Sequence, residues 1–178
     1  MPDSDCMTIV ELTSPDVSTA QFKRLFETMC AESVDLYDEC TSAEVYCTEN
    51  GTRGKYETVV STFKFPLLYE RLIVNTRYNF FNYMGQEGAH ISLSSSRGNE
   101  KFMNKESLGE KLFDGYRVVA LVSIDGYCVT PLTANGGTKL TFITKSSSSG
   151  IPFYLYKKFM SSKMSSAFDK ILAKVQTY

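Results

Sequence analysis

The last quarter of the chain carries a hydrophobic pattern with helical spacing. From Pro152 onward, apolar residues recur every three or four positions and therefore share one stripe of a helix. Pro152 suits the first turn of a helix, and Gly150 suits the turn before it. The pattern predicts one long amphipathic helix that continues to the C-terminus and covers an apolar surface. The stripe consists of Phe153, Tyr156, Phe159, Met160, Met164, Ala167, Phe168, Ile171, Leu172 and Val175.

A second helical pattern follows the N-terminal residues. Ser18 and Gln21 have the S-x-x-Q spacing of a capping box. Apolar residues then recur at helical spacing, at Phe22, Leu25, Phe26 and Met29. We expect a helix over about residues 19–30, with a continuation near 33–39.

Between the two helices the hydrophobic period changes to two, which is typical of strands. Val45 and Cys47 alternate with polar residues up to Asn50-Gly51, a strong hairpin signal, and the returning strand is expected at 56–63. Asp125-Gly126 and Asn135-Gly136-Gly137 are interpreted as turns. Residues 98–115 carry no clear pattern. Further strands are predicted at residues 68–81, 89–96, 116–124, 127–132 and 138–145.

Composition excludes several classes of protein. The 178 residues are 43% hydrophobic and 13% aromatic, which predicts a single globular domain over residues 1–178. A net charge of −1 gives no overall attraction to nucleic acid. The five cysteines are an odd number without a C-x-x-C pair, which favours reduced thiols over disulfides or a zinc site. Without a signal peptide or an apolar span, we expect a cytoplasmic protein.

Three segments resemble one known family. They are Val17–Tyr37, Phe65–Arg77 with its proline-containing loop and two arginines six residues apart, and Gly115–Val175 with the last strands and the long helix. In order and spacing, the chain is similar to the START (StAR-related lipid-transfer) domains of the helix-grip, or Bet v 1-like, superfamily. The resemblance implies an α+β helix-grip fold: a curved antiparallel sheet wrapped around a long C-terminal helix, with a lipid-sized cavity.

The chain departs from the family pattern in two ways. Family members usually begin with another helix and two strands before the point where this sequence starts, so we expect an N-terminally shortened sheet. An open edge of such a sheet would allow a homodimer to form. The Trp-Asp pair that commonly follows the short helices is replaced by Leu36-Tyr37-Asp38. These departures leave open the type of lipid and whether the cavity is closed.

Arg77 is the main candidate for holding a polar head group. It lies in an apolar strand pattern, and a buried guanidinium needs an acid or a polar ligand, because an unpaired charge in a dry site is costly. The resemblance implies an acidic partner on the preceding strand, and Glu57 is the candidate, displaced by about one residue. The alternative is that Arg77 is exposed on the outer face. The candidates for lining the cavity are Tyr78, Tyr116, Tyr156, Phe159, Met160 and Met164. The alternative is that these side chains belong to an ordinary packed core.

The loop over residues 64–70 is the candidate gate. Phe65, Leu67 and Leu68 are large apolar residues in a connection that should be polar, so the loop is expected to contact a membrane or act as a lid. By resemblance it lies beside the C-terminal helix, whose lysines would attract anionic head groups during a transient membrane contact. Alternatively, the three side chains fold back as permanent core.

Catalytic patterns are weak. The one histidine, His90, lies in a strand pattern and is interpreted as a partly exposed strand residue. Gly51–Lys55 lacks the spacing of a phosphate-binding loop, and neither a nucleophile elbow nor a metal-ligand cluster is present. We therefore predict no catalytic residue, metal or cofactor, and favour non-catalytic binding and transfer of a lipid, either a sterol or a phospholipid. The alternatives are a helix-grip cyclase or hydrolase using Arg77, Glu57 and His90, and an interaction module without a cavity.

Overall fold

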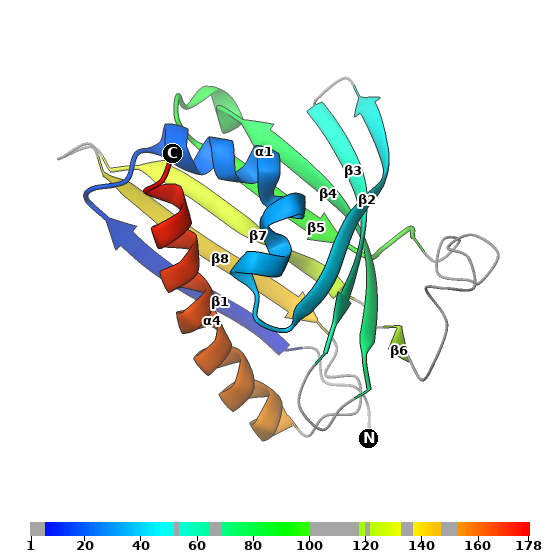
Figure 1. The fold of residues 1–178 in the computed structure, drawn as a ribbon. Helices are drawn as coiled ribbons and strands as arrows, with labels where there is room; N and C mark the ends of the chain where they lie inside the picture. The colour runs from blue at the N-terminus through cyan, green and yellow to red at the C-terminus, as the bar shows by residue number, and fades with distance from the viewer. Residues whose placement is uncertain are drawn as a thin grey trace.

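In the part of the chain that the structure describes, one curved antiparallel sheet forms the body, and two α-helices lie on its concave side (Figure 1). The computed structural model describes residues 6–51, 54–64, 69–99, 118–119, 122–132, 137–146 and 153–178. Within these residues the strand order is β1-β8-β7-β5-β4-β3-β2, and the short β6 runs parallel to β4. The predicted helix-grip architecture is confirmed. The strands are β1 (Cys6–Ser14), β2 (Cys40–Gly51), β3 (Gly54–Phe63), β4 (Arg71–Phe81), β5 (His90–Ser95), β6 (Val118–Val119), β7 (Val122–Pro131) and β8 (Thr138–Ser146).

The first helix, α1 (Thr19–Leu36), begins at the predicted capping box. The Ser18 hydroxyl accepts a hydrogen bond from the Gln21 N–H at 3.4 Å, and the Gln21 side chain accepts one from the Ser18 N–H at 2.9 Å. The helix continues past residue 30 without a break. Ser33 does not interrupt it, because its buried hydroxyl donates to the Met29 carbonyl at 2.7 Å.

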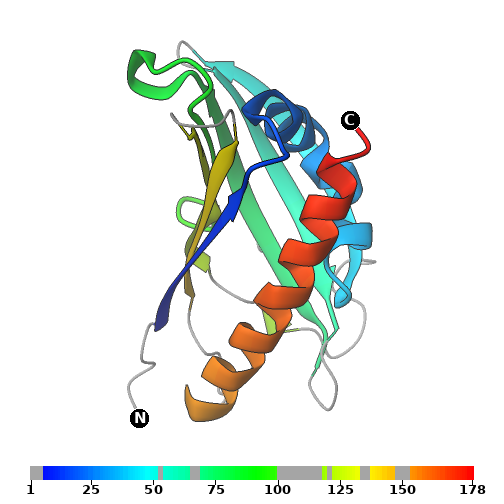
Figure 2. The same ribbon diagram turned by 90° about the vertical axis from the view of Figure 1, so that its left-hand side faces the viewer.

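The long C-terminal helix α4 (Phe153–Val175) also matches the prediction. Figure 2 shows it running along the concave side of the sheet, with α1 beside its C-terminal half. That half packs Met164, Phe168 and Ile171 against α1 and the inner faces of β7 and β8. The main hydrophobic core therefore lies at the end of the sheet where the two helices meet. No helix in the described part of the chain is both long and apolar enough to cross a membrane.

Two parts of the sheet differ from the sequence prediction. Strand β1 was not predicted, yet it pairs with β8 from Cys6↔Ser146 to Ser14↔Thr138. The expected turn at Asp125-Gly126 is also wrong, since both residues lie inside the continuous strand β7. Only glycine fits at this position, because β5 passes close to the backbone of β7. A Cβ on residue 126 would lie 2.2 Å from the Ser92 carbonyl oxygen of β5.

Hairpins connect two pairs of neighbouring strands. β2 and β3 form the predicted hairpin, with Gly51 opposite Gly54. β7 and β8 form another, in which the Leu132 N–H donates to the Gly137 carbonyl at 2.8 Å. Among the described strands, β1 and β2 are the two edges of the sheet. The patternless segment 98–115 lies mostly outside the described residues.

Candidate ligand site

A line of polar residues crosses the concave face of the sheet. Directly opposite residues of antiparallel strands present their side chains to the same face. Arg77 of β4 lies opposite Glu57 of β3 on one side and opposite Ser94 of β5 on the other. The line continues through β7, β8 and β1. We call it the polar row, and it consists of Glu57, Arg77, Ser94, Asp125, Thr144 and Thr8.

Contacts with α1 show that the polar row faces the helices. Asn79, two residues from Arg77 and so on the same face of β4, donates to the Phe26 carbonyl of α1 at 3.4 Å. Arg77 itself lies beside Cys30 of α1. Burial raises the pKa of the Cys30 thiol, whereas the charge of Arg77 and its hydrogen bond to the sulfur act in the opposite direction.

Arg77 is buried but incompletely satisfied. Its side chain is 7% exposed, so the alternative of an outward-facing arginine is wrong. Within the described structure, its Nη1 is buried and lacks a hydrogen-bond partner. Glu57 opposite is 6% exposed, and its carboxylate forms an ion pair with the Lys55 ammonium at 2.5 Å. The carboxylate opposite Arg77 in the strand register therefore pairs with a different cation, Lys55.

The other charged member of the row is Asp125. Burial raises its pKa to about 6, and a hydrogen bond from the Thr144 hydroxyl and the charge of Arg77 oppose that rise. Tyr37 at the end of α1 and Tyr127 of β7 hydrogen-bond to each other through their hydroxyls at 2.5 Å. Burial is the main cause that raises the pKa of both phenols, and the negative charge of Asp125 adds to it.

Further polar groups flank the row on β4 and directly after β5. The Ser96 hydroxyl donates to the Asn75 side chain at 2.6 Å and accepts from the Val122 N–H at 3.1 Å. Asn79 Oδ1, like Arg77 Nη1, is buried without a partner within the described structure. Because Asn75, Arg77 and Asn79 alternate along one face of β4, the middle of the concave face is polar rather than apolar.

Other predicted lining residues fall elsewhere. Tyr78 points to the opposite face from its neighbour Arg77, and its ring packs on Tyr56 with centroids 5.1 Å apart, so it does not lie beside the polar row. Met164 is part of the hydrophobic core. The positions of Phe65, Leu67, Leu68 and Tyr116 lie outside the described residues, as do the side chains of Tyr156, Phe159 and Met160.

His90 does not join Arg77 and Glu57. It is 4% exposed, not partly exposed as expected from the sequence, and its ring packs on Phe81 with centroids 5.4 Å apart. It lies opposite Phe81, four residues along β4 from Arg77, which corresponds to about 13 Å. Burial lowers its pKa. The described residues contain no group of histidines, cysteines and acids that would hold a metal ion.

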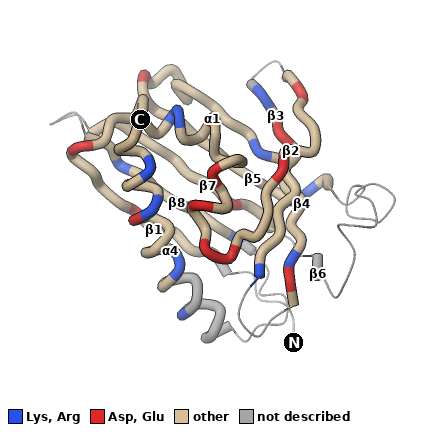
Figure 3. Tube along the Cα trace, viewed as in Figure 1, with Lys and Arg blue, Asp and Glu red and all other residues tan. Residues whose placement is uncertain are grey.

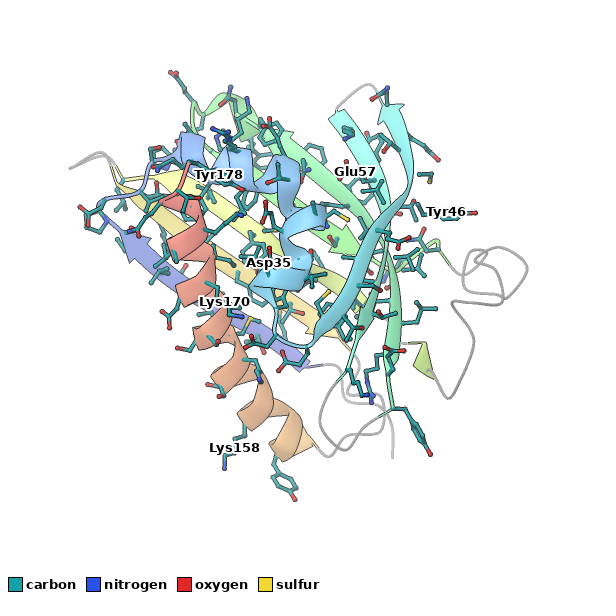
Figure 4. All side chains as sticks on the ribbon, viewed as in Figure 1. Asp35, Tyr46, Glu57, Lys158, Lys170 and Tyr178 are labelled. Atoms are coloured by element: carbon teal, nitrogen blue, oxygen red, sulfur yellow. The ribbon has the colours of Figure 1, made fainter. Side chains whose placement is uncertain are left out.

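The lysines of α4 pair with acids of the same chain. Lys163 pairs with Glu39, Lys170 with Asp38, and Lys174 with Glu32 at 2.7 Å. Figure 3 shows basic positions along α4 and acidic positions at the end of α1 and in the connection to β2. Figure 4 shows Lys170 beside Asp35 of α1, whereas Lys158 lies near the other end of α4. Lys163, Lys170 and Lys174 are therefore paired within the chain, and the attraction of the α4 lysines to anionic head groups stays a prediction.

Comparison with known proteins supports the fold. No family model and no curated sequence matches the chain. Among solved structures, human STARD10 matches with a TM-score of 0.73 and 14% identity over 100% of this chain and 66% of that chain. Human StAR-related lipid transfer protein 5 matches with a TM-score of 0.69 and 13% identity over 96% of this chain and 76% of that chain.

A bacterial structure gives the same result. A STAR-related lipid transfer protein from Xanthomonas axonopodis matches with a TM-score of 0.65 and 10% identity, covering 96% of this chain and 85% of that chain. At these identities the matches show the fold alone. The chain thus has the START fold that its sequence resembles, and it spans about two thirds of STARD10.

Proposed function

We propose that the protein binds a lipid between the concave face of its sheet and α4, and transfers it between membranes without catalysis. The START fold supports this function. The polar row supplies groups that could hold a head group, and the N-terminal half of α4 extends beyond the core where the helices meet.

The observation that carries the proposal is the buried guanidinium of Arg77. A buried charge with an unsatisfied donor is costly, and natural interiors rarely leave one. Arg77 Nη1 is such a donor, and the nearest acid in register, Glu57, already pairs with Lys55. A polar ligand head that accepts a hydrogen bond from Nη1 would remove this cost.

The remaining parts of the proposal follow from the sequence. We propose that Tyr116, Tyr156, Phe159 and Met160 line the path of the lipid tail. The segment with Phe65, Leu67 and Leu68 would open together with α4 during a transient contact with a membrane surface, in the cytoplasm. Pairing of two copies would use one of the edge strands β1 and β2.

Lipids bound to the purified protein give the direct test. We expect mass spectrometry of an organic extract to find about one lipid per chain. Arg77→Met should lower that occupancy and slow transfer between vesicles, whereas Arg97→Met, at an exposed position, should change neither. A lipid-free protein that also takes up no lipid from vesicles would contradict the proposal and favour the interaction module. Chemical conversion of a bound ligand would favour the enzyme.

A further inference from the structure

The connection between β4 and β5, residues 82–89, holds a backbone conformation that costs free energy. Asn82 and Met84 have φ angles of 53° and 55°, in the left-handed region that residues other than glycine rarely adopt. Such a conformation persists only where the surrounding contacts impose it. One of these contacts lies within the connection, where the Gly88 N–H donates to the side-chain oxygen of Asn82 at 3.1 Å.

A second contact joins the connection to His90, the first residue of β5. The Asn82 N–H donates to Nδ1 of His90 at 3.4 Å, and the imidazole accepts this hydrogen bond only while Nδ1 carries no proton. His90 is buried, and its ring packs on Phe81. Because both nitrogens of a charged imidazole are donors, protonation of His90 places two N–H donors against each other. The conformation of the connection therefore depends on the charge of His90.

The same connection lies against the start of α1 (Figure 1). A Cβ on Gly88 would lie 2.7 Å from the hydroxyl oxygen of Thr19, the first residue of α1. One turn further along the helix, the Lys23 ammonium lies over the Phe81 ring, 5.0 Å from its centre. Phe81 thus contacts both Lys23 and His90, so the start of α1 and the imidazole belong to one packed cluster.

The surroundings of His90 oppose a positive charge on the imidazole. Burial lowers its pKa from the ordinary 6.5, and the charge of Lys23 lowers it further, whereas a hydrogen bond to the Ala89 carbonyl and the charge of Glu27 raise it. Lys23 and Glu27 both lie on α1. With the pKa lowered in the folded state, the contact is fully stable above pH 6.5 and weakens as the pH falls below it. The residues that face His90 from β4 and β7 do not titrate, and they are Phe81 and Val129.

We propose that protonation of His90 releases the β4–β5 connection and the first turn of α1 from the sheet, so that the protein opens at this end as the pH falls from 7 to 5. Relaxation of the left-handed residues Asn82 and Met84 favours the open state. The bond from Asn79 to the Phe26 carbonyl joins α1 to β4 beside the polar row, so this opening weakens the cover of that row. Faster release of a lipid at acidic pH rests on the proposed function, whereas the switch itself requires no lipid.

The titration can be followed in the intact protein, because His90 is the one histidine of the chain. We expect its NMR signals to titrate below pH 6.5. Hydrogen exchange at the Asn82 and Gly88 amides then measures the opening. Since one proton is bound, their protection factors should fall by up to about tenfold per pH unit between pH 6.5 and the pKa of His90 in the folded protein. Titration at or above pH 6.5, or constant protection down to pH 5, would overturn the proposal.

Variants of His90 separate the hydrogen-bond acceptor from the charge. His90→Gln keeps a side-chain oxygen that can accept from the Asn82 N–H but does not titrate, so its protection should not vary between pH 7 and pH 5. His90→Phe has no acceptor, and its protection at pH 7 should already resemble that of the wild type at pH 5. Glu87→Gln, at an exposed position of the connection, is the control and should keep the pH dependence. A folded His90→Gln protein that opens with pH as the wild type does would overturn the role of His90.

Release of lipid tests the consequence for transfer. The protein is loaded at pH 7 from vesicles that contain a fluorescent phosphatidylcholine and a fluorescent sterol. Release into unlabelled phosphatidylcholine vesicles, which carry no net charge in this interval, is then followed at pH 7 and pH 5. We expect release from the wild type to be at least about fivefold faster at pH 5, and release from His90→Gln to change less.

The comparison of these two proteins isolates His90. Asp125 also titrates near pH 6, but it does so in both proteins, so a difference between them belongs to His90. Equal acceleration in both would overturn the link between the switch and release. A wild type that takes up neither lipid would reject the proposed function, whereas NMR and hydrogen exchange would still decide the switch.

Discussion

At the scale of single residues, Glu57 is the acid that lies opposite Arg77 in the strand register. It is buried, it lies opposite Arg77, and it pairs with Lys55 at 2.5 Å. Glu57→Gln keeps the shape but removes the charge, so the buried guanidinium loses its nearest compensation. We expect the free energy of unfolding to fall by about 3 to 5 kcal/mol, measured by urea denaturation. Glu49→Gln, at an exposed position of β2, is the control, and a loss as small as that of the control would show that Glu57 does not compensate Arg77.

Asp125 gives stability a specific dependence on pH. Its pKa is raised from an ordinary value of 3.8 to about 6, so in this interval the folded state binds more protons than the unfolded state. The contribution of Asp125 to stability is therefore greatest below pH 4 and is lost as the pH rises to about 6. Asp125→Asn should gain stability relative to the wild type between pH 4 and pH 7, by about 1 to 3 kcal/mol. A difference in unfolding free energy that does not vary with pH would contradict this.

At the scale of elements, β7 and β5 approach each other closely at Gly126. A Cβ there would meet the Ser92 carbonyl oxygen, which is backbone and cannot rotate away. Gly126→Ala should therefore destabilise the protein by about 2 to 4 kcal/mol, measured by urea denaturation, and Thr130→Ala on the same strand should cost much less. A loss for Gly126→Ala no larger than that for Thr130→Ala would contradict the close approach of β7 to β5.

The second element of interest is α4, whose lysines form ion pairs with acids of the same chain. Glu39 and Asp38 in the connection to β2 bind Lys163 and Lys170 of α4. If α4 moves when a lipid enters, Glu39→Gln with Asp38→Asn should speed transfer between vesicles, both by releasing the helix and by freeing two lysines for anionic head groups.

Removal of the lysines distinguishes the two effects. Lys163→Gln with Lys170→Gln also removes both ion pairs, but it leaves the acids Asp38 and Glu39 without these partners instead of the two lysines. Faster transfer in both double variants would indicate that the ion pairs act only as a restraint on α4. Faster transfer in the acid variant with slower transfer in the lysine variant would indicate that the lysines contact the membrane. Unchanged transfer in both would contradict any movement of this part of α4.

At the scale of the whole molecule, the two edges of the described sheet differ. The pairing of β2 with β3 shifts register between Val45 and Cys47, and such a bulge disfavours further pairing at an edge. The pairing of β1 with β8 has no shift, and Met7 and Ile9 of β1 are 55% and 56% exposed. If the protein forms dimers, β1 is the expected edge.

Sedimentation velocity over a range of concentrations tests this expectation. Ile9→Lys adds a charge to the β1 edge and should shift a dimer toward monomer, whereas Tyr46→Lys on β2 should leave the distribution unchanged. A dimer that persists in Ile9→Lys, or one that is lost only in the β2 variant, would contradict pairing through β1.

The sequence by itself determined the elements with strong local signals. The Ser18–Gln21 capping box, the Asn50-Gly51 hairpin and the stripe of α4 depend on neighbours within a few residues, so their periods and spacings are visible in the chain. The resemblance to START domains then predicted how these elements assemble, and the inward direction of Arg77 agrees with it.

Only the tertiary structure decided which residues meet across strands. Strand β1 went unrecognised because apolar residues occur on both of its faces, with Val10 inside and Ile9 outside, so no alternation stands out. Asp125-Gly126 was interpreted as a turn because the demand for glycine comes from Ser92, more than thirty residues away. The polar row and the pairs between α4 and the end of α1 depend on strand register and helix packing, which nonlocal contacts set and no local period encodes.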